Sequence, residues 1–224
     1  MLTQTADARP YALPSRLKVR TGFEPEKSIG LFRGKEKAFG PNEDLFNEGD
    51  PADCIFMITR GAVRSYKLLG EGRRKIEAFR LRGDVFGFDP GTEREFCAQA
   101  IDEVCVLIAR RHSFVDAATS YETMRELCAV SARELRRVQQ HTLLLAMTAP
   151  QRMACFLIEM LRRLGERHIV ELPMSRQDIA DYLGLSIETV SRAFARFEAS
   201  GLISLPTSRH IVLHEPEALQ RMCE

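Results

Sequence analysis

The chain has 224 residues, of which 45% are hydrophobic and 28% are charged, and its net charge is +1. This length suffices for one large domain or two modest ones, and the composition is that of an ordinary globular protein. The near-zero net charge excludes a globally basic surface, so any affinity for nucleic acid has to come from local arrangements of arginine.

Residues 1–34 form an N-terminal extension ahead of the first strand signals. The stretch 1–25 is polar and basic without an apolar core, which is not the pattern of a secretory signal. No apolar run in the chain approaches the length of a transmembrane span. We therefore expect a cytoplasmic protein with no membrane partner.

Residues 35–112 read as short strands separated by turns that contain glycine. Strand candidates are 54–58, 62–66, 75–79 and 104–108. This spacing predicts an antiparallel double-sheet roll. No histidine occurs between residues 39 and 111, so a metal-dependent enzyme built on the roll lacks ligands, and we expect neither a metal nor enzymatic activity.

A single long helix is predicted for residues 113–148. Its apolar and small residues alternate in steps of three and four, which is typical of the a and d positions of a coiled coil. The seam comprises Tyr121, Met124, Cys128, Ser131, Leu135, Val138, Thr142 and Leu145. We expect a homodimer held by Met124, Cys128, Leu135, Val138 and Leu145. The alternative is a helix that packs only on its own chain.

Residues 149–224 contain the most informative segment, two short helices joined at Gly184. Ser175 is a candidate N-cap for the first helix, with Asp178 completing a capping box. Gly184 permits the turn, and Ser186 is a preferred N-cap for the second helix. The pattern predicts a helix-turn-helix, in which the second helix enters the DNA major groove.

The second helix places Ile187, Glu188, Ser191 and Arg192 on the side opposite its apolar face. Glu188 and Arg192 are spaced i,i+4, so we expect them to pair and to fix the guanidinium for bidentate contact with guanine. The Glu188 carboxylate can accept a hydrogen bond from the N4 amino group of cytosine, and Ile187 offers an apolar surface for a thymine methyl. The alternative is a solvated salt bridge of little consequence.

Residues 202–205 and 210–213 read as the two strands of a hairpin, the wing of a winged helix, although an ordinary hairpin has the same pattern. Hydroxyl and basic side chains near the helix starts and the hairpin tip are candidates for DNA phosphate contact. These candidates are Ser175, Arg176, Ser186, Thr189, Arg196 and Arg209.

The six cysteines show no C-x-x-C pair and no regular spacing, which argues against a zinc site or a disulfide framework. We expect most of them to be buried, reduced thiols. Cys223 is expected to be the most exposed and reactive, and Cys223 and Cys128 are the candidates for oxidation.

The fold class is therefore α+β, with an N-terminal roll, a long helix and a winged helix-turn-helix. The segments 43–50, 56–61 and 82–87 resemble the cyclic-nucleotide-binding-like jelly roll of the CRP/FNR regulators. Ile187, Glu188, Ser191 and Arg192 resemble the FNR and FixK branch, since the cyclic-AMP branch has an arginine where this chain has Ile187. The resemblance runs from about residue 35 to the end, and the chain length and the extended N-terminus are most similar to those of the FixK-type regulators of rhizobia.

This resemblance implies a transcription activator that binds a TTG…CAA palindrome in double-stranded DNA as a homodimer and recruits RNA polymerase. The implied targets are microaerobic and nitrogen-fixation genes. A regulator from a different functional class remains open, a ligand-gated sensor whose roll binds an unidentified small molecule.

The departures from the family concern its effectors, and we expect no cofactor. Cyclic-nucleotide binders place a glutamate where this chain has Phe88, and the candidate phosphate ligand Arg94 lies between Glu93 and Glu95, which oppose an anion. The oxygen-sensing members use an N-terminal cysteine cluster to ligate iron and sulfur, whereas the first cysteine here is Cys54.

Overall fold

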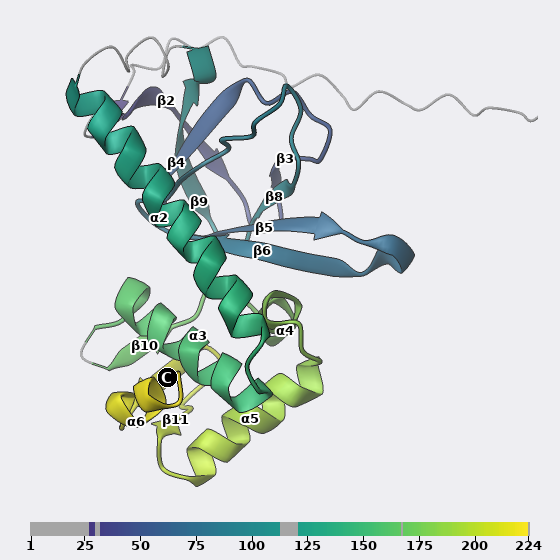
Figure 1. Ribbon diagram of the computed structural model, residues 1–224, viewed down its shortest axis with the longest axis vertical. Helices are drawn as coiled ribbons and strands as arrows, with labels where there is room; N and C mark the ends of the chain where they lie inside the picture. Colours follow the sequence, from purple (N-terminus) through teal and green to yellow (C-terminus); the bar gives the residue numbers. More distant parts are fainter. Residues whose placement is uncertain (1–26, 30–31, 113–120, 167, 224) are drawn as a thin grey trace, which may run out of the picture.

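The computed structural model describes residues 27–29, 32–112, 121–166 and 168–223. A β-roll is followed by one long helix and a smaller C-terminal domain, and the long helix runs past the roll toward that domain (Figure 1). Within the described residues, no helix combines the length and apolar character needed to cross a bilayer.

The roll consists of two antiparallel sheets, which confirms the predicted architecture. The strand orders are β1-β2-β9-β4-β7 and β3-β8-β5-β6. The strands are β1 (Lys27–Ile29), β2 (Phe32–Phe39), β3 (Asp44–Phe46), β4 (Cys54–Arg60), β5 (Val63–Leu68), β6 (Arg74–Arg80), β7 (Val85–Phe86), β8 (Cys97–Ala100) and β9 (Val104–Arg110), with the 3-10 turn η1 (Gly70–Gly72) between β5 and β6. The first sheet begins at Lys27, upstream of residue 35, because β1 pairs with β2.

Aromatic side chains fill the interior of the roll. The ring of Phe56 stacks on that of Phe86 with centroids 5.5 Å apart, and Phe46 lies 5.2 Å from Phe56. These are favourable separations for aromatic pairs, and the surrounding aliphatic core is fully buried. The interior of the roll is therefore occupied by its own side chains.

The long helix α2 (Tyr121–Leu145) fixes one of its faces to the rest of the chain. Glu134 pairs with Arg80 of β6, and Arg137 donates to Asp84 at 3.2 Å. One turn further on, the His141 ring lies 3.0 Å from the carbonyl oxygen of Tyr182 in the C-terminal domain. These three positions share a face because their spacings of three and four match the helical turn.

The C-terminal domain consists of α3 (Ala149–Leu164), β10 (Ile169–Glu171), α4 (Arg176–Leu183), α5 (Ile187–Ala199), β11 (Ile203–Ser204), β12 (His210–Leu213) and α6 (Pro216–Arg221). The predicted hairpin is present, because β11 pairs with β12 antiparallel. Sequence reasoning missed β10, which pairs with the other edge of β12.

The roll and the C-terminal domain share a hydrophobic cluster, to which the roll contributes Ala62, Ile76, Phe79 and Leu81. Phe79 of β6 lies 5.1 Å from the ring of Tyr182 in α4 and 6.2 Å from that of Phe156 in α3. All three side chains are at most 4% exposed. Because aromatic burial is a large stabilising term, Phe79 anchors the C-terminal domain beneath the roll.

Candidate nucleic-acid interface

The first helix of the predicted pair, α4, begins as the sequence indicates. The Ser175 hydroxyl accepts a hydrogen bond from the Asp178 amide at 3.1 Å, and the Asp178 carboxylate accepts from the Ser175 amide at the same distance. This reciprocal arrangement is a capping box, and it satisfies backbone donors that the helix itself leaves unpaired.

The turn between the helices depends on Gly184, whose φ of 64° lies in the left-handed region. The Leu185 amide after it donates to the Ala180 carbonyl. Arg152 of α3 holds the same corner, since it donates to the carbonyls of Leu183 and Leu145 at 2.9 and 2.7 Å. A cation at two helix C-termini is favourable for both helix dipoles and fixes the point from which α5 departs.

The second helix, α5, begins at the predicted cap. The Ser186 hydroxyl accepts from the Thr189 amide at 3.2 Å. Val190, Phe194 and Phe197 are at most 2% exposed and anchor one side of the helix to the domain core. The opposite side faces solvent and contains the candidate base-reading residues, so the predicted amphipathic division of α5 is confirmed.

The candidate reading face is therefore accessible at the N-terminal end of α5. Ile187 is 38% exposed, Glu188 and Arg192 are exposed, and Ser191 is half-buried. An exposed arginine, carboxylate and apolar side chain within two turns supply the three kinds of contact that distinguish base pairs in the major groove.

The expected ion pair between Glu188 and Arg192 is absent from the structure, although both side chains are described. Arg192 donates to the Thr189 hydroxyl at 3.2 Å instead. The Glu188 carboxylate turns back to its own amide and to the Ser186 hydroxyl, and these hydrogen bonds hold the pKa of Glu188 below its ordinary value. Sequence spacing predicted the wrong partner because the helix N-terminus competes for the carboxylate.

The candidate phosphate-contacting residues occupy several parts of the domain. Ser175 and Ser186 are exposed at the starts of α4 and α5, and Arg196 and Arg209 are exposed on α5 and at the hairpin tip. Arg176 is half-buried, and its guanidinium lies 5.0 Å from the centroid of the Phe194 ring. This cation–π contact positions Arg176 beside α5.

The structure also places an ion cluster between α4 and the roll that the sequence did not reveal. Asp178, only 3% exposed, accepts from Arg64 of β5 at 3.3 Å and from Arg74 of β6 at 2.6 Å. Arg74 also pairs with Asp181 at 2.7 Å. Asp178 therefore both caps α4 and docks it on the β5–β6 hairpin, which lies directly above α4 in Figure 1.

The C-terminal end of α4 is held as well. The Lys75 ammonium donates to the carbonyl of Tyr182 at 2.8 Å, and the His141 ring bonds the same oxygen. Burial, with Arg152 nearby, lowers the pKa of Lys75, and burial lowers that of His141. Two basic groups on one carbonyl fix α4 against both the roll and α2.

The predicted dimer seam lies on the free side of α2. Leu135, Met124 and Val138 are 60%, 49% and 47% exposed, and Cys128 is exposed beside them. Leu145, at the end of the seam, is half-buried. Cys223, expected to be the most exposed thiol, is only half-buried because it packs against the core of the C-terminal domain.

Arg94, the candidate phosphate ligand of the roll, is directed into the protein. It donates to the Asp89 carboxylate at 2.8 Å and to the Gly87 carbonyl at 2.9 Å, and its guanidinium lies 4.4 Å from the Phe46 ring centroid. The side chain is only 1% exposed. The guanidinium that an anionic ligand would need is therefore already paired with the Asp89 carboxylate.

Comparison with known families gives two matches that together span most of the chain. Residues 36–121 match the model of the cyclic nucleotide-binding domain. Residues 151–222 match the model of the Crp-like helix-turn-helix domain. The two regions correspond to the roll with the start of α2 and to the C-terminal domain.

Individual proteins extend this similarity. The nitrogen fixation regulation protein FixK of Azorhizobium caulinodans is 43% identical over 197 residues, which cover 84% of this chain and 79% of the relative. The transcriptional activatory protein AadR of Rhodopseudomonas palustris is 42% identical over 171 residues, or 74% of this chain and 72% of that one. The structure of FixK2 from Bradyrhizobium japonicum superimposes with a TM-score of 0.81 at 42% identity, covering 85% of this chain and 97% of that chain.

Proposed function

This chain belongs to the FixK-type branch of the CRP/FNR family of DNA-binding transcription regulators, and we propose that it activates transcription as a homodimer bound to a TTG…CAA palindrome. The observation that carries the proposal is the free face of α5. The N-terminal end of α5 is the end that enters the major groove in this motif, and its exposed side chains are Ile187, Glu188 and Arg192. We expect Arg192 to donate a bidentate pair of hydrogen bonds to guanine, and Glu188 to accept a hydrogen bond from cytosine.

The exposed seam of α2 supports the homodimer. Leucine, methionine and valine side chains in a regular row on a free helix face are suited to burial against an identical row. A two-fold dimer matches a palindrome, because each α5 then meets one half-site in an equivalent orientation.

The names of the relatives support the biological role. FixK proteins are named as regulators of nitrogen fixation, and AadR is named as an activator. We infer that this chain controls nitrogen-fixation and microaerobic genes and that it recruits RNA polymerase to their promoters. Run-off transcription with purified polymerase tests the last step, since omission of the regulator should abolish the transcript.

The proposal includes no cyclic nucleotide and no iron–sulfur effector. The engagement of Arg94 by Asp89 supports the first part, because a ligand phosphate would have to displace a carboxylate already in place. The roll then acts as a support that positions α2 and α4 for DNA binding.

The experiment that tests the proposal measures binding of the purified, reduced protein to a labelled TTGAT…ATCAA duplex, with no ligand added. A scrambled duplex of equal length is the control. Tight and selective binding is expected. Equal binding to both duplexes would refute the proposed operator, and selectivity that appears only after a small molecule is added would favour a ligand-gated sensor.

The dimer has its own test in Leu135→Asp. A charge at the centre of the seam should split the dimer and weaken operator binding at least tenfold, because one half-site then binds alone. Leu143→Asp is the matched control, since Leu143 is 65% exposed on the same helix but lies outside the seam. An unchanged mass in solution scattering for Leu135→Asp would contradict the seam.

A further inference from the structure

One arginine of α3 joins the helix that carries the seam to the turn of the DNA-binding motif. Arg152 is half-buried. Toward α2, its guanidinium donates to the carbonyls of Leu145 and Met147 at 2.7 and 2.9 Å. Toward the α4–α5 turn, it donates to the carbonyls of Leu183 and Gly184 at 2.9 and 3.5 Å. A single side chain therefore bridges the end of α2 and the point from which α5 departs.

The place of Arg152 in its own helix shows what it is suited to. Arg152 lies in the first turn of α3, where the positive end of the helix dipole disfavours a cation, and no acidic residue in that turn offsets the charge. The favourable partners are the carbonyls at the C-terminal ends of α2 and α4, which a helix leaves unpaired. The guanidinium is therefore stabilised by the two neighbouring helices and not by its own.

The seam of α2 also contacts the turn directly. A Cβ atom added to Gly184 would lie 3.6 Å from the side chain of Leu145, 3.6 Å from the Arg152 guanidinium and 3.9 Å from the Lys75 ammonium. Leu145 is the last residue of the predicted seam, and the C-terminal end of α2 lies beside the turn (Figure 1). The row of side chains suited to dimerisation thus ends where the recognition helix is about to begin.

We propose that Arg152 sets the separation of the two half-sites that the homodimer accepts. With two α2 helices paired along the seam, the orientation of each α5 relative to the two-fold axis depends on the corner that Arg152 holds. The inference rests on the homodimer and palindrome proposed above, and it adds the spacing of the half-sites to what the protein recognises. Arg152 touches no base in this role and is a positioning residue.

The geometry of DNA makes the stiffness of this corner measurable. One base pair added at the centre of a palindrome moves a half-site by about 3.4 Å along the duplex and rotates it by about 35° around the axis. A rigid dimer cannot follow both changes, so one α5 loses its contacts. A dimer with a loose corner follows part of the change, but it has to be ordered on binding and therefore binds its best operator more weakly.

Other contacts should keep the domain folded when Arg152 is replaced. Asp178 docks the start of α4 on the roll, and Lys75 and His141 both bond the Tyr182 carbonyl. These contacts hold α4 ahead of the turn, whereas Arg152 bonds the turn itself. Replacement of Arg152 should therefore loosen α5 relative to α2 and leave the reading face of α5 intact.

The test measures binding of the full-length parent and of Arg152→Met to TTG…CAA duplexes whose half-site separation differs by single base pairs. A duplex with one half-site is included. We expect the parent to prefer its best separation at least about tenfold over the adjacent ones, and Arg152→Met to reduce this preference to about threefold. Affinity for the single half-site should be unchanged. Arg152→Lys should be intermediate, because an ammonium lacks the fork that reaches both helix ends.

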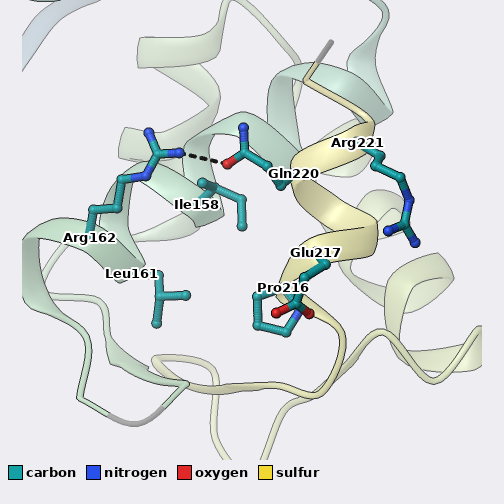
Figure 2. Close-up of a pocket in the computed structure, with 7 residues that line it drawn as sticks. All are labelled: Ile158, Leu161, Arg162, Pro216, Glu217, Gln220 and Arg221. Atoms are coloured by element: carbon teal, nitrogen blue, oxygen red, sulfur yellow. Dashed lines mark hydrogen bonds between the residues drawn. The ribbon is translucent and has the colours of Figure 1, made fainter.

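Arg162→Met is the matched control on the same helix. Arg162 is exposed, and its guanidinium donates to the amide oxygen of Gln220 in α6 at 2.6 Å. Figure 2 shows this contact between the outer surfaces of α3 and α6. Since Arg162 bridges α3 to α6 and not α2 to the turn, Arg162→Met should keep the spacing preference of the parent.

Several results would overturn the inference. One is the same spacing preference in Arg152→Met as in the parent, and another is an equal loss of preference in Arg162→Met. A loss of single half-site binding in Arg152→Met would place Arg152 in support of the reading face instead. A parent that binds the palindrome selectively at every separation would leave no spacing to set. A parent that does not distinguish the palindrome from scrambled DNA refutes the operator itself, which is visible before any substitution is made.

Discussion

The two helices of the DNA-binding motif differ in how their charged side chains are used. On α4, Asp178 and Asp181 are engaged by Arg64 and Arg74 of the roll, and Asp178 is almost fully buried. On α5, the charged side chains Glu188, Arg192, Arg196 and Glu198 are exposed. The chain itself therefore positions the first helix, whereas the second helix presents its charged side chains to another molecule.

The buried cluster on α4 contributes orientation more than net stability. Removing two arginines and an aspartate from water costs several kcal/mol, and their mutual attraction offsets that cost only when every group is well paired. The Asp178 carboxylate meets this condition with four donors, namely the guanidinium groups of Arg64 and Arg74 and the hydroxyl and amide of Ser175. A cluster of this kind favours one docking geometry over nearby alternatives.

The largest expected effect comes from Asp178→Ala, which takes the carboxylate partner from Arg64, leaves Arg74 with Asp181 alone, and removes the Asp178 half of the capping box of α4. We expect the free energy of unfolding to fall by about 3–5 kcal/mol, measured by urea denaturation. The exposed acid Glu188 provides the comparison, since Glu188→Ala should leave the free energy of unfolding unchanged. Equal losses for the two variants would remove the distinction between the helices.

Asp178→Asn separates charge from capping. The amide oxygen can still accept from the Ser175 amide, whereas its attraction for Arg64 and Arg74 is lost. We expect a loss smaller than that of Asp178→Ala but still measurable. A full recovery of stability would show that the arginines contribute nothing to the docking of α4.

Arg192→Ala tests base reading by the exposed face of α5. It should weaken operator binding by about 1–3 kcal/mol and relax the preference at one base pair, with no change in stability. Arg196→Ala, one turn further along α5, is the control, because loss of a phosphate contact weakens all sequences alike and lowers the salt dependence. A uniform loss for Arg192→Ala, including on scrambled DNA, would contradict base reading.

A smaller effect is expected for Glu188→Ala. Since Glu188 and Arg192 are not paired in the free protein, its removal should leave the Arg192 contact in place and reduce discrimination at the neighbouring cytosine severalfold. Competition binding against a panel of single-base operator variants measures this. Identical discrimination by the variant and the parent would exclude Glu188 from base reading.

The smallest effect is the dependence of α4 docking on pH. Burial holds the pKa of His141 below the 6.5 of the free side chain, so the unfolded chain binds more protons as the pH falls below 6.5. The free energy of unfolding should therefore decrease as the pH falls below 6.5, and the contribution of His141 should be fully present above 6.5. Charged neighbours of His141 are Lys75, Glu77 and Glu159. His141→Gln should flatten this part of the pH profile, and an unchanged slope would assign it to another group.

Much of the motif could be predicted because its signals are local. Ser175 caps α4, Gly184 adopts the left-handed turn and Ser186 caps α5, each through contacts within a few residues. The roll, the long helix and the hairpin also follow from the periodicity of apolar residues and the placement of turns. These features depend on backbone chemistry that neighbouring residues determine.

The charged contacts could not be predicted, because their partners come from distant parts of the chain. Arg64 and Arg74 lie more than 100 residues before Asp178 in sequence. Sequence spacing assigned Arg192 to Glu188, whereas the cap of α5 engages the glutamate and Thr189 accepts from the arginine. A long side chain selects among several acceptors, and periodicity does not rank them.

The Asp84 carboxylate of the roll should be a site of mutations that alter promoter output. Asp84 accepts from Arg137 of α2 through one oxygen, and from Arg163 of α3 and the Leu81 amide through the other. Three parts of the chain thus converge on a turn that is remote in sequence from α5. In a screen for altered promoter output, substitutions at Asp84 should therefore be recovered alongside those in the recognition helix, although Asp84 itself belongs to the support.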